Sequence, residues 1–201
     1  MNVIYVATTS IPRYRGIART IRLIDNNIEI KDIFRLNIIA PQEKGKNESE
    51  IARQKVVYYQ KILKNNVLCE DDGIYFAGVK DKFQIKHLVH RKNIKIGQNK
   101  LDFWLKYLRK HRISSGILKK VFALSVKNRC FVEKVQIPIK FCYQSSNKNE
   151  SRNIFNELMI PDKFTKSFSE MGEKEKVLFS KLYLVYPLKK LLLRLRLFSK
   201  K

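Results

Sequence analysis

NVIYVA, at residues 2–7, is a short run of apolar and β-branched side chains, and TTSIP follows it at residues 8–12. The pattern predicts a buried strand that leads into a loop. In open α/β sheets, the loop after the carboxyl end of such a strand lines the ligand crevice, so Thr9 and Ser10 are candidate ligand-binding residues. The expected architecture is an α/β fold.

Hydrophobic patterns along the rest of the chain predict the other elements. Strands are expected at residues 32–40, 67–69, 74–77 and 130–143, and helices at 51–63, 101–110, 117–126 and 150–159. Ser114 or Ser115 is a natural N-cap for the helix predicted at 117–126. Between two short strands, Asp71-Asp72-Gly73 is either an acidic pair able to bind a metal ion or a plain turn.

Composition indicates a folded protein with an anionic partner. The chain has 201 residues, 44% of them hydrophobic, which is enough for a core without disulfides. Its 42 Lys and Arg against 18 Asp and Glu give a net charge of +24, which favours a neutralising partner such as nucleic acid, anionic lipid or a sugar nucleotide. The three cysteines and three histidines have no zinc-site spacing, and no cofactor is predicted.

The C-terminal segment, residues 177–201, differs from the main domain predicted at residues 1–176 because it contains no acidic residue. Its apolar stripe and the cations around it are Leu188, Leu191, Leu192, Leu195 and Phe198, with Lys189, Lys190, Arg194, Arg196, Lys200 and Lys201. This pattern is typical of a basic amphipathic helix on an anionic membrane surface. The alternative is docking on the protein's own core, which the wider face made by Leu193 and Leu197 disfavours. We expect a cytoplasmic protein, at most peripheral on the inner face of the membrane.

Two polar motifs are candidate binding sites. In Arg112-Ile113-Ser114-Ser115-Gly116, small residues at the start of a helix would let backbone N–H groups approach an anion, and Arg112 would add contacts to phosphate. In the strand predicted at 32–40, Asn37 can both donate and accept hydrogen bonds, as a reader of a nucleobase or sugar must. A capped helix with a surface arginine and a half-exposed edge strand are the alternative interpretations.

The order of these motifs resembles the bacterial sialyltransferases of lipooligosaccharide synthesis, of the Campylobacter and Haemophilus type. The resemblance rests on Phe34-Arg35-Leu36-Asn37 and on Arg112-Ile113-Ser114-Ser115-Gly116. It implies a nucleotide-binding, Rossmann-like fold, with a mostly parallel sheet flanked by helices. It also implies a metal-independent glycosyltransferase of lipopolysaccharide biosynthesis, which transfers sialic acid from CMP-sialic acid to a cell-surface glycan acceptor.

The same resemblance implies roles for particular residues. Asn37 would contact the donor nucleotide. Ser114, Ser115 and Gly116 would line the phosphate and sugar pocket with Arg112 nearby, and Tyr143 would lie near the leaving group. No histidine follows His111, so the general base that the family uses is unassigned.

Two other functions stay open at this point. A basic nucleic-acid-binding protein would use the +24 charge for phosphate contacts and interleaved aromatics for stacking on bases. A catalytically inactive relative of the glycosyltransferases would bind a glycan or act as a scaffold, and the missing histidine motivates it.

Overall fold

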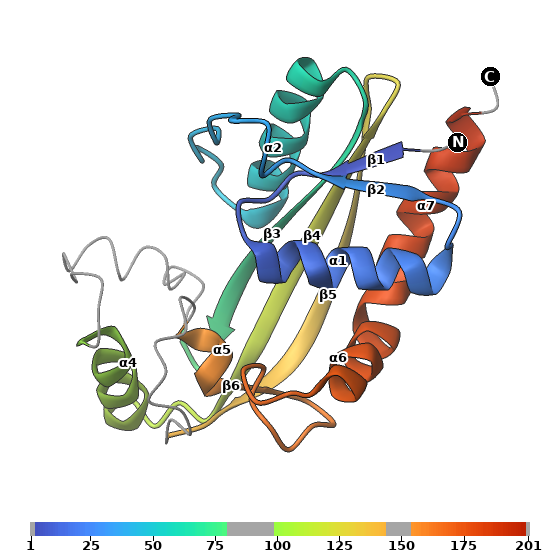
Figure 1. Ribbon diagram of the computed structural model, residues 1–201. Coiled ribbons are helices and arrows are strands. Elements are labelled where there is room, and N and C mark those ends of the chain that lie inside the picture. The colour runs from blue at the N-terminus through green and yellow to red at the C-terminus, as the bar shows by residue number, and fades with distance from the viewer. Residues whose placement is uncertain (1–2, 80–98, 144–153, 200–201) are drawn as a thin grey trace. The chain divides into compact units, whose positions relative to one another are not determined.

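The computed structural model describes residues 3–79, 99–143 and 154–199 (Figure 1). The chain divides into two compact units. The first unit comprises residues 1–72, 120–135 and 173–201, and the second comprises residues 73–119 and 136–172. The predicted division at residue 176, into a main domain and a C-terminal segment, stays a prediction.

One sheet contains the six strands of the described ranges, in the order β2-β1-β3-β4-β5-β6. The strands are β1 (Val3–Val6), β2 (Glu29–Asp32), β3 (Asn66–Phe76), β4 (Ser115–Val126), β5 (Arg129–Phe141) and β6 (Met159–Pro161). Strand β1 runs parallel to both β2 and β3, whereas β6 is antiparallel to β5. Lys127 and Asn128 both have positive φ, which is the geometry of the two-residue turn of an antiparallel hairpin. The prediction of an α/β fold is therefore confirmed, but the sheet is mixed and not a mostly parallel Rossmann sheet.

The helices are α1 (Ile11–Ile24), α2 (Glu48–Leu63), α4 (Asn99–Lys110), α5 (Phe155–Leu158), α6 (Glu173–Phe179) and α7 (Val185–Ser199), with the π-helical segment η1 (Ser180–Leu184) between the last two. The helices predicted at 51–63 and 101–110 are confirmed as α2 and α4. The strands predicted at 2–7 and 130–143 are confirmed as β1 and β5, with boundaries shifted by one or two residues. Of the helix predicted at 150–159, only α5 falls within the described residues.

Three predicted elements are wrong, each for a local reason. Residues 117–126 form strand β4, because the run 121–126 is buried on both faces and such a run has no period that separates strand from helix. Residues 33–40 leave the sheet after the Asp32 side chain accepts a hydrogen bond from the Phe34 amide at 2.9 Å, which turns the chain. Asp71-Asp72-Gly73 is no turn, since β3 continues through it.

The C-terminal helix packs on its own unit. Leu188, Leu191, Leu192 and Leu195 are buried, and α7 contacts α1, which crosses it in Figure 1. Arg196 donates a 2.7 Å hydrogen bond to the Asp25 carboxylate at the end of α1. The leucine stripe predicted to face a membrane is therefore used in the core, and only the flanking Leu193 and Leu197 are exposed. In the part of the chain that the structure describes, no helix is long and apolar enough to cross a bilayer.

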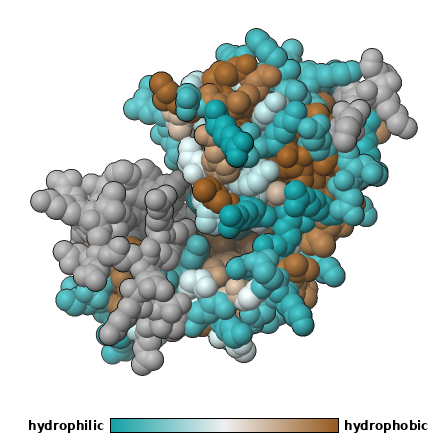
Figure 2. Space-filling model, in the orientation of Figure 1, coloured by the Kyte–Doolittle hydropathy of each residue, from teal (hydrophilic) through white to brown (hydrophobic). Residues whose placement is uncertain are grey.

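The cations predicted on this helix fall into two groups. Lys189, Lys190, Arg194 and Arg196 are exposed on α7, and Lys200 and Lys201 lie outside the described residues. Most of the described surface in Figure 2 is hydrophilic, and the hydrophobic side chains are scattered among polar ones. The contact of these cations with a membrane surface stays a prediction. The leucines that were expected to enter the membrane beside them are buried in the protein.

Gly16 lies inside α1, where a glycine weakens a helix. No atom lies within 4 Å of the position that a Cβ would take, and the Thr20 hydroxyl bonds to the Gly16 carbonyl, which a methyl group leaves in place. We expect Gly16→Ala to stabilise the protein by about 0.5–1 kcal/mol. Thermal unfolding should show Tm raised by about 1–4 °C. A lowered Tm would contradict the open space beside α1.

Candidate functional site

The loop after β1 brings the amino end of α1 to the carboxyl end of a parallel strand. The Thr8 hydroxyl accepts a hydrogen bond from the Ser10 amide at 3.1 Å, which shapes the loop. Ser10 is the N-cap of α1, and the first turn of this helix contains no acidic residue that would neutralise its positive end. A helix start of this kind, at this edge of the sheet, suits an anion. Thr9 is exposed on this loop, where the sequence placed it.

Strand β3 carries three consecutive carboxylates past the end of β1. Val6, the last residue of β1, pairs with Leu68, so Glu70, Asp71 and Asp72 follow directly beyond the paired region. Successive side chains of a strand point to opposite faces. Glu70 and Asp72 therefore lie on one face of the sheet, and Asp71 lies on the other.

On the first face, two cations bind the carboxylates. The Lys120 ammonium of β4 forms ion pairs with Glu70 and, at 3.8 Å, with Asp72. The Arg13 guanidinium of α1 donates a 2.6 Å hydrogen bond to Asp72. Burial works against the charge of Arg13, but the attraction of Asp72, Glu70 and Asp71 outweighs it, and the pKa of Arg13 is raised. Arg13 is thus a permanent cation in the first turn of α1.

On the second face, one lysine lies between two carboxylates. The Lys55 ammonium of α2 is 2.9 Å from Asp71 Oδ1 and 2.6 Å from Glu43 Oε1. The Asp71 side chain is only 1% exposed, so its charge needs this partner. Burial of Lys55 opposes its charge, yet Asp71 and Glu43 raise its pKa above the ordinary 10.5. A raised folded-state pKa means that this ion pair stabilises the fold fully below the unfolded-state pKa, and the stabilisation is lost as pH rises through the folded-state value.

This site, named here the β3 cluster, consists of Arg13, Glu43, Lys55, Glu70, Asp71, Asp72 and Lys120, all in the first unit. Its three cations lie on both faces of β3, with Arg13 and Lys120 on one face and Lys55 on the other, and cations of these types suit phosphate groups. Beside the cluster, Cys69 is fully buried, and burial raises the pKa of its thiol, so it is inert packing.

Divalent cations are a natural companion of polyphosphates. Within residues 3–79, 99–143 and 154–199, no group of three or more His, Cys, Asp or Glu side chains could hold a metal ion. Mg²⁺ in nucleotide sites needs fewer protein ligands, because it takes one or two carboxylates and completes its shell with phosphates and water. Glu43 and Asp71 converge on a single ammonium group and so fit this requirement.

The residues that the sequence grouped into one pocket belong to two different units of the structure. Thr9, Ser10 and Asn37 belong to the first unit, whereas Arg112, Ser114, Ser115, Gly116 and Tyr143 belong to the second. Asn37 is exposed in a turn with a positive φ of 48°. Asn37 was predicted to contact a nucleotide from within a core strand, but residue 37 is not part of a strand.

The Ser-Ser-Gly motif has a structural role. Ser115 begins β4, so there is no helix start whose N–H groups could bind a phosphate. Gly116 lies so close to β3 that a Cβ would be 2.4 Å from the Tyr75 carbonyl oxygen, which explains the glycine. The Tyr143 hydroxyl donates a 2.8 Å hydrogen bond to the Ile113 carbonyl, and exposed Arg112 has a positive φ of 52°. As a donor-sugar pocket this group stays untested.

Sequence reasoning missed Arg13, Glu43, Lys55, Glu70 and Lys120. The sequence does contain one indication of these residues, the acidic run that follows the apolar residues 67–69. Carboxylates in the continuation of a buried strand need cations beside them, because an unpaired buried charge is costly. The partners come from α1, α2, β4 and a loop, which no spacing along the chain reveals.

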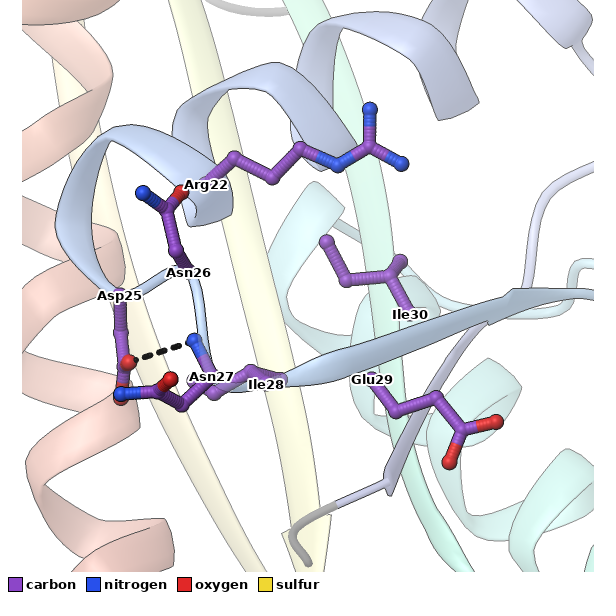
Figure 3. A pocket seen from close by; sticks show the side chains of 7 residues that line it. All are labelled: Arg22, Asp25, Asn26, Asn27, Ile28, Glu29 and Ile30. Carbon is purple, nitrogen blue, oxygen red and sulfur yellow. Dashed lines mark hydrogen bonds between the residues drawn. The ribbon is translucent and has the colours of Figure 1, made fainter.

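Two surface depressions lie elsewhere. One is lined by Arg22, Asp25 and residues 26–30, where Figure 3 shows the Asn27 amide bonded to the Asp25 carboxylate. It sits at the end of α1 and the amino end of β2, whereas ligands of parallel sheets bind at the carboxyl ends. The other, of about 480 Å³, lies in the second unit between Tyr75, Gly116, Pro138 and Asp162.

The mixed sheet with its covering helices is the fold of HAM1 and nucleoside-triphosphate pyrophosphatase structures. A HAM1 protein from Coxiella burnetii superposes with a TM-score of 0.75 at 14% identity, over 96% of this chain and 100% of that chain. The Ham1 protein of Staphylococcus aureus gives 0.64 at 16% identity, over 87% and 89% of the two chains.

A third structure is described by its activity. The nucleoside-triphosphatase / dITP/XTP pyrophosphatase of Mycobacterium abscessus gives a TM-score of 0.62 at 13% identity, over 89% of this chain and 94% of that chain. No family model and no curated protein matches the chain by sequence. At these identities the likeness shows the fold.

The fold overturns the sialyltransferase resemblance. Its structural neighbours are HAM1 proteins, so the predictions of a glycosyltransferase, of lipopolysaccharide biosynthesis, and of CMP-sialic acid and a glycan acceptor as partners are wrong. The inactive glycosyltransferase relative is wrong with them. The anionic membrane and nucleic acid, named as further partners, find no support in this fold. The two short motifs lie in different units, and their resemblance is one of order along the chain only.

Proposed function

We propose that this protein hydrolyses nucleoside triphosphates to nucleoside monophosphates and pyrophosphate. The observation that carries the proposal is that the Lys55 ammonium of α2 lies between the carboxylates of Glu43 and Asp71. Asp71 belongs to β3, the strand that continues past the end of β1. The proposal is further supported by the fold shared with HAM1 proteins, one of whose relatives in fold is described as a dITP/XTP pyrophosphatase. The net charge of +24 attracts a polyanionic substrate.

The residues of the β3 cluster divide the work by their charge. Arg13 and Lys120, on one face of β3, and Lys55, on the other, would each contact phosphate groups that lie past the end of β1, and the amino end of α1 would add backbone N–H groups. The bond that breaks joins the α-phosphorus to the oxygen of the β-phosphate, and water supplies the new oxygen on the α-phosphorus. The proton of that water passes to a carboxylate of the cluster.

A divalent cation fits this scheme. Glu43 and Asp71 would hold Mg²⁺ that enters with the nucleotide, and the ion would neutralise the charge that develops on the phosphate oxygens. Lys55 is protonated at every pH below its raised pKa, so its part is to hold phosphate and to orient these two carboxylates.

The test is pyrophosphate release from a panel of purine and pyrimidine triphosphates, including inosine and xanthosine triphosphates, with the purified protein and Mg²⁺. We expect equal amounts of monophosphate and pyrophosphate from at least one triphosphate, and no product without the metal ion. CMP-sialic acid serves as the control substrate and should stay intact.

Two outcomes would count against the proposal. Release of orthophosphate in place of pyrophosphate would mean attack at the γ-phosphorus, and no hydrolysis of any triphosphate would remove the assigned activity.

A further inference from the structure

The loop at residues 41–47 carries Glu43 to the β3 cluster from outside the sheet. Glu43 lies before α2, whose N-cap is Asn47, whereas its partner Lys55 lies inside that helix. Lys55 lies eight positions after Asn47, which is about 12 Å along the helix axis. The loop therefore folds back along α2, and something must hold it there.

Glu50 binds the end of this loop from inside the first turn of α2. Its carboxylate accepts hydrogen bonds from the Lys46 amide at 2.8 Å and from Asn47 Nδ2 at 3.2 Å. In return, Asn47 Oδ1 accepts a hydrogen bond from the Glu50 amide at 3.0 Å. This is a reciprocal cap, but it reaches one residue further back than the usual one, which bonds the N-cap amide.

Gly45 lets the loop touch the helix. A Cβ at this position would lie 2.7 Å from both the backbone nitrogen and Cγ1 of Ile51 and 3.0 Å from the Glu50 Cβ. Backbone cannot give way as a flexible side chain does, so any larger residue would lift the loop from α2. Gly45 is two residues from Glu43, so the displacement would move the carboxylate.

We infer that Glu50 and Gly45 are positioning residues that hold the Glu43 carboxylate on Lys55. Neither residue touches the phosphates; each acts through the loop. This inference rests on the proposed function for its effect on catalysis, but its structural part is independent of activity. The carboxylate that would share Mg²⁺ with Asp71 is thus set in place by the cap of a helix.

The first test needs no nucleotide. Trypsin cuts after lysine, and Lys44 and Lys46 lie in the loop. Losing a charged hydrogen-bond acceptor should open the loop, so Glu50→Gln is expected to speed cleavage at these two bonds about tenfold, as followed by mass spectrometry. Glu173→Gln, the same change in the first turn of α6, is the matched control and should leave the two cleavage rates unchanged. Equal rates in wild type and Glu50→Gln would overturn the inference.

The second test is a double-mutant cycle on pyrophosphate release. Glu50→Gln and Gly45→Ala should each lower kcat/KM about tenfold, the size seen when the support of a metal ligand is lost. In a Glu43→Gln background they should lower it no further, because the group that they position is gone. Effects that add fully in that background would show a general loss of structure and would overturn the inference. If wild type hydrolyses nothing, the proposed function fails, and the cleavage rates still decide the role of the loop.

Discussion

Asp71→Asn is expected to lower kcat for pyrophosphate release by at least about 100-fold. The change keeps the shape of the side chain but removes the only charge that β3 presents on the Lys55 face. An amide binds Mg²⁺ more weakly than a carboxylate and does not accept a proton from water. Steady-state kinetics with the best triphosphate of the panel measures the loss.

The fold should survive this substitution. Lys55 keeps Glu43 as its partner, so the loss of stability should stay below the about 3–5 kcal/mol that breaking a buried ion pair costs. Asp25→Asn is the matched control, because Asp25 also pairs with a cation but lies at the far end of α1 from Arg13. A full rate in Asp71→Asn, or an equal loss in Asp25→Asn, would remove Asp71 from the reaction.

Leu188→Ala is expected to destabilise the protein by about 2–5 kcal/mol. Leu188 is fully buried in the first turn of α7, where it packs inside the first unit, and alanine would leave a cavity. Thermal unfolding should show Tm lowered by about 4–20 °C, at roughly 2–4 °C per kcal/mol for a chain of this size.

Leu197→Ala separates the two interpretations of this helix. Leu197 is 62% exposed on the same helix, so its replacement should change the free energy of unfolding by less than about 0.5 kcal/mol. If Leu188→Ala left Tm unchanged, while Leu197→Ala abolished binding to anionic vesicles, α7 would be a membrane-surface helix and its docking on α1 would be wrong.

The sequence predicts elements with a clear period better than it predicts buried runs. The apolar residues of helix α4 recur at the helical period, whereas strand β5 alternates exposed and buried residues toward its end, so the sequence predicts the type of each element. Residues 121–126 of β4 are apolar throughout, because both faces of this strand are covered, and the period that separates strand from helix is absent. The mixed sheet follows from β4, which leads into β5 through a two-residue turn, and from β6, which runs antiparallel to β5.

The β3 cluster could be predicted only in part. Asp71 and Asp72 were noticed as an acidic pair, but a following glycine usually marks a turn. Gly73 instead lies within β3. The cations that neutralise the carboxylates of this strand come from distant parts of the chain. Thr9 and Ser10 were placed correctly at the end of β1, because that expectation depends on one strand and the loop directly after it.

The partners in the β3 cluster have a consequence for the order of folding events. Arg13 is 59 residues from Asp72, and Lys120 is 50 residues from Glu70. Contacts that close such long loops form late, because the entropy of closure is lost before they add stability. Before β1 and β4 flank β3, the three carboxylates repel one another and no phosphate site exists. During refolding, the rate of triphosphate hydrolysis should therefore recover later than the helical circular-dichroism signal. The return of hydrolysis would then report when the last long-range contacts of the fold form.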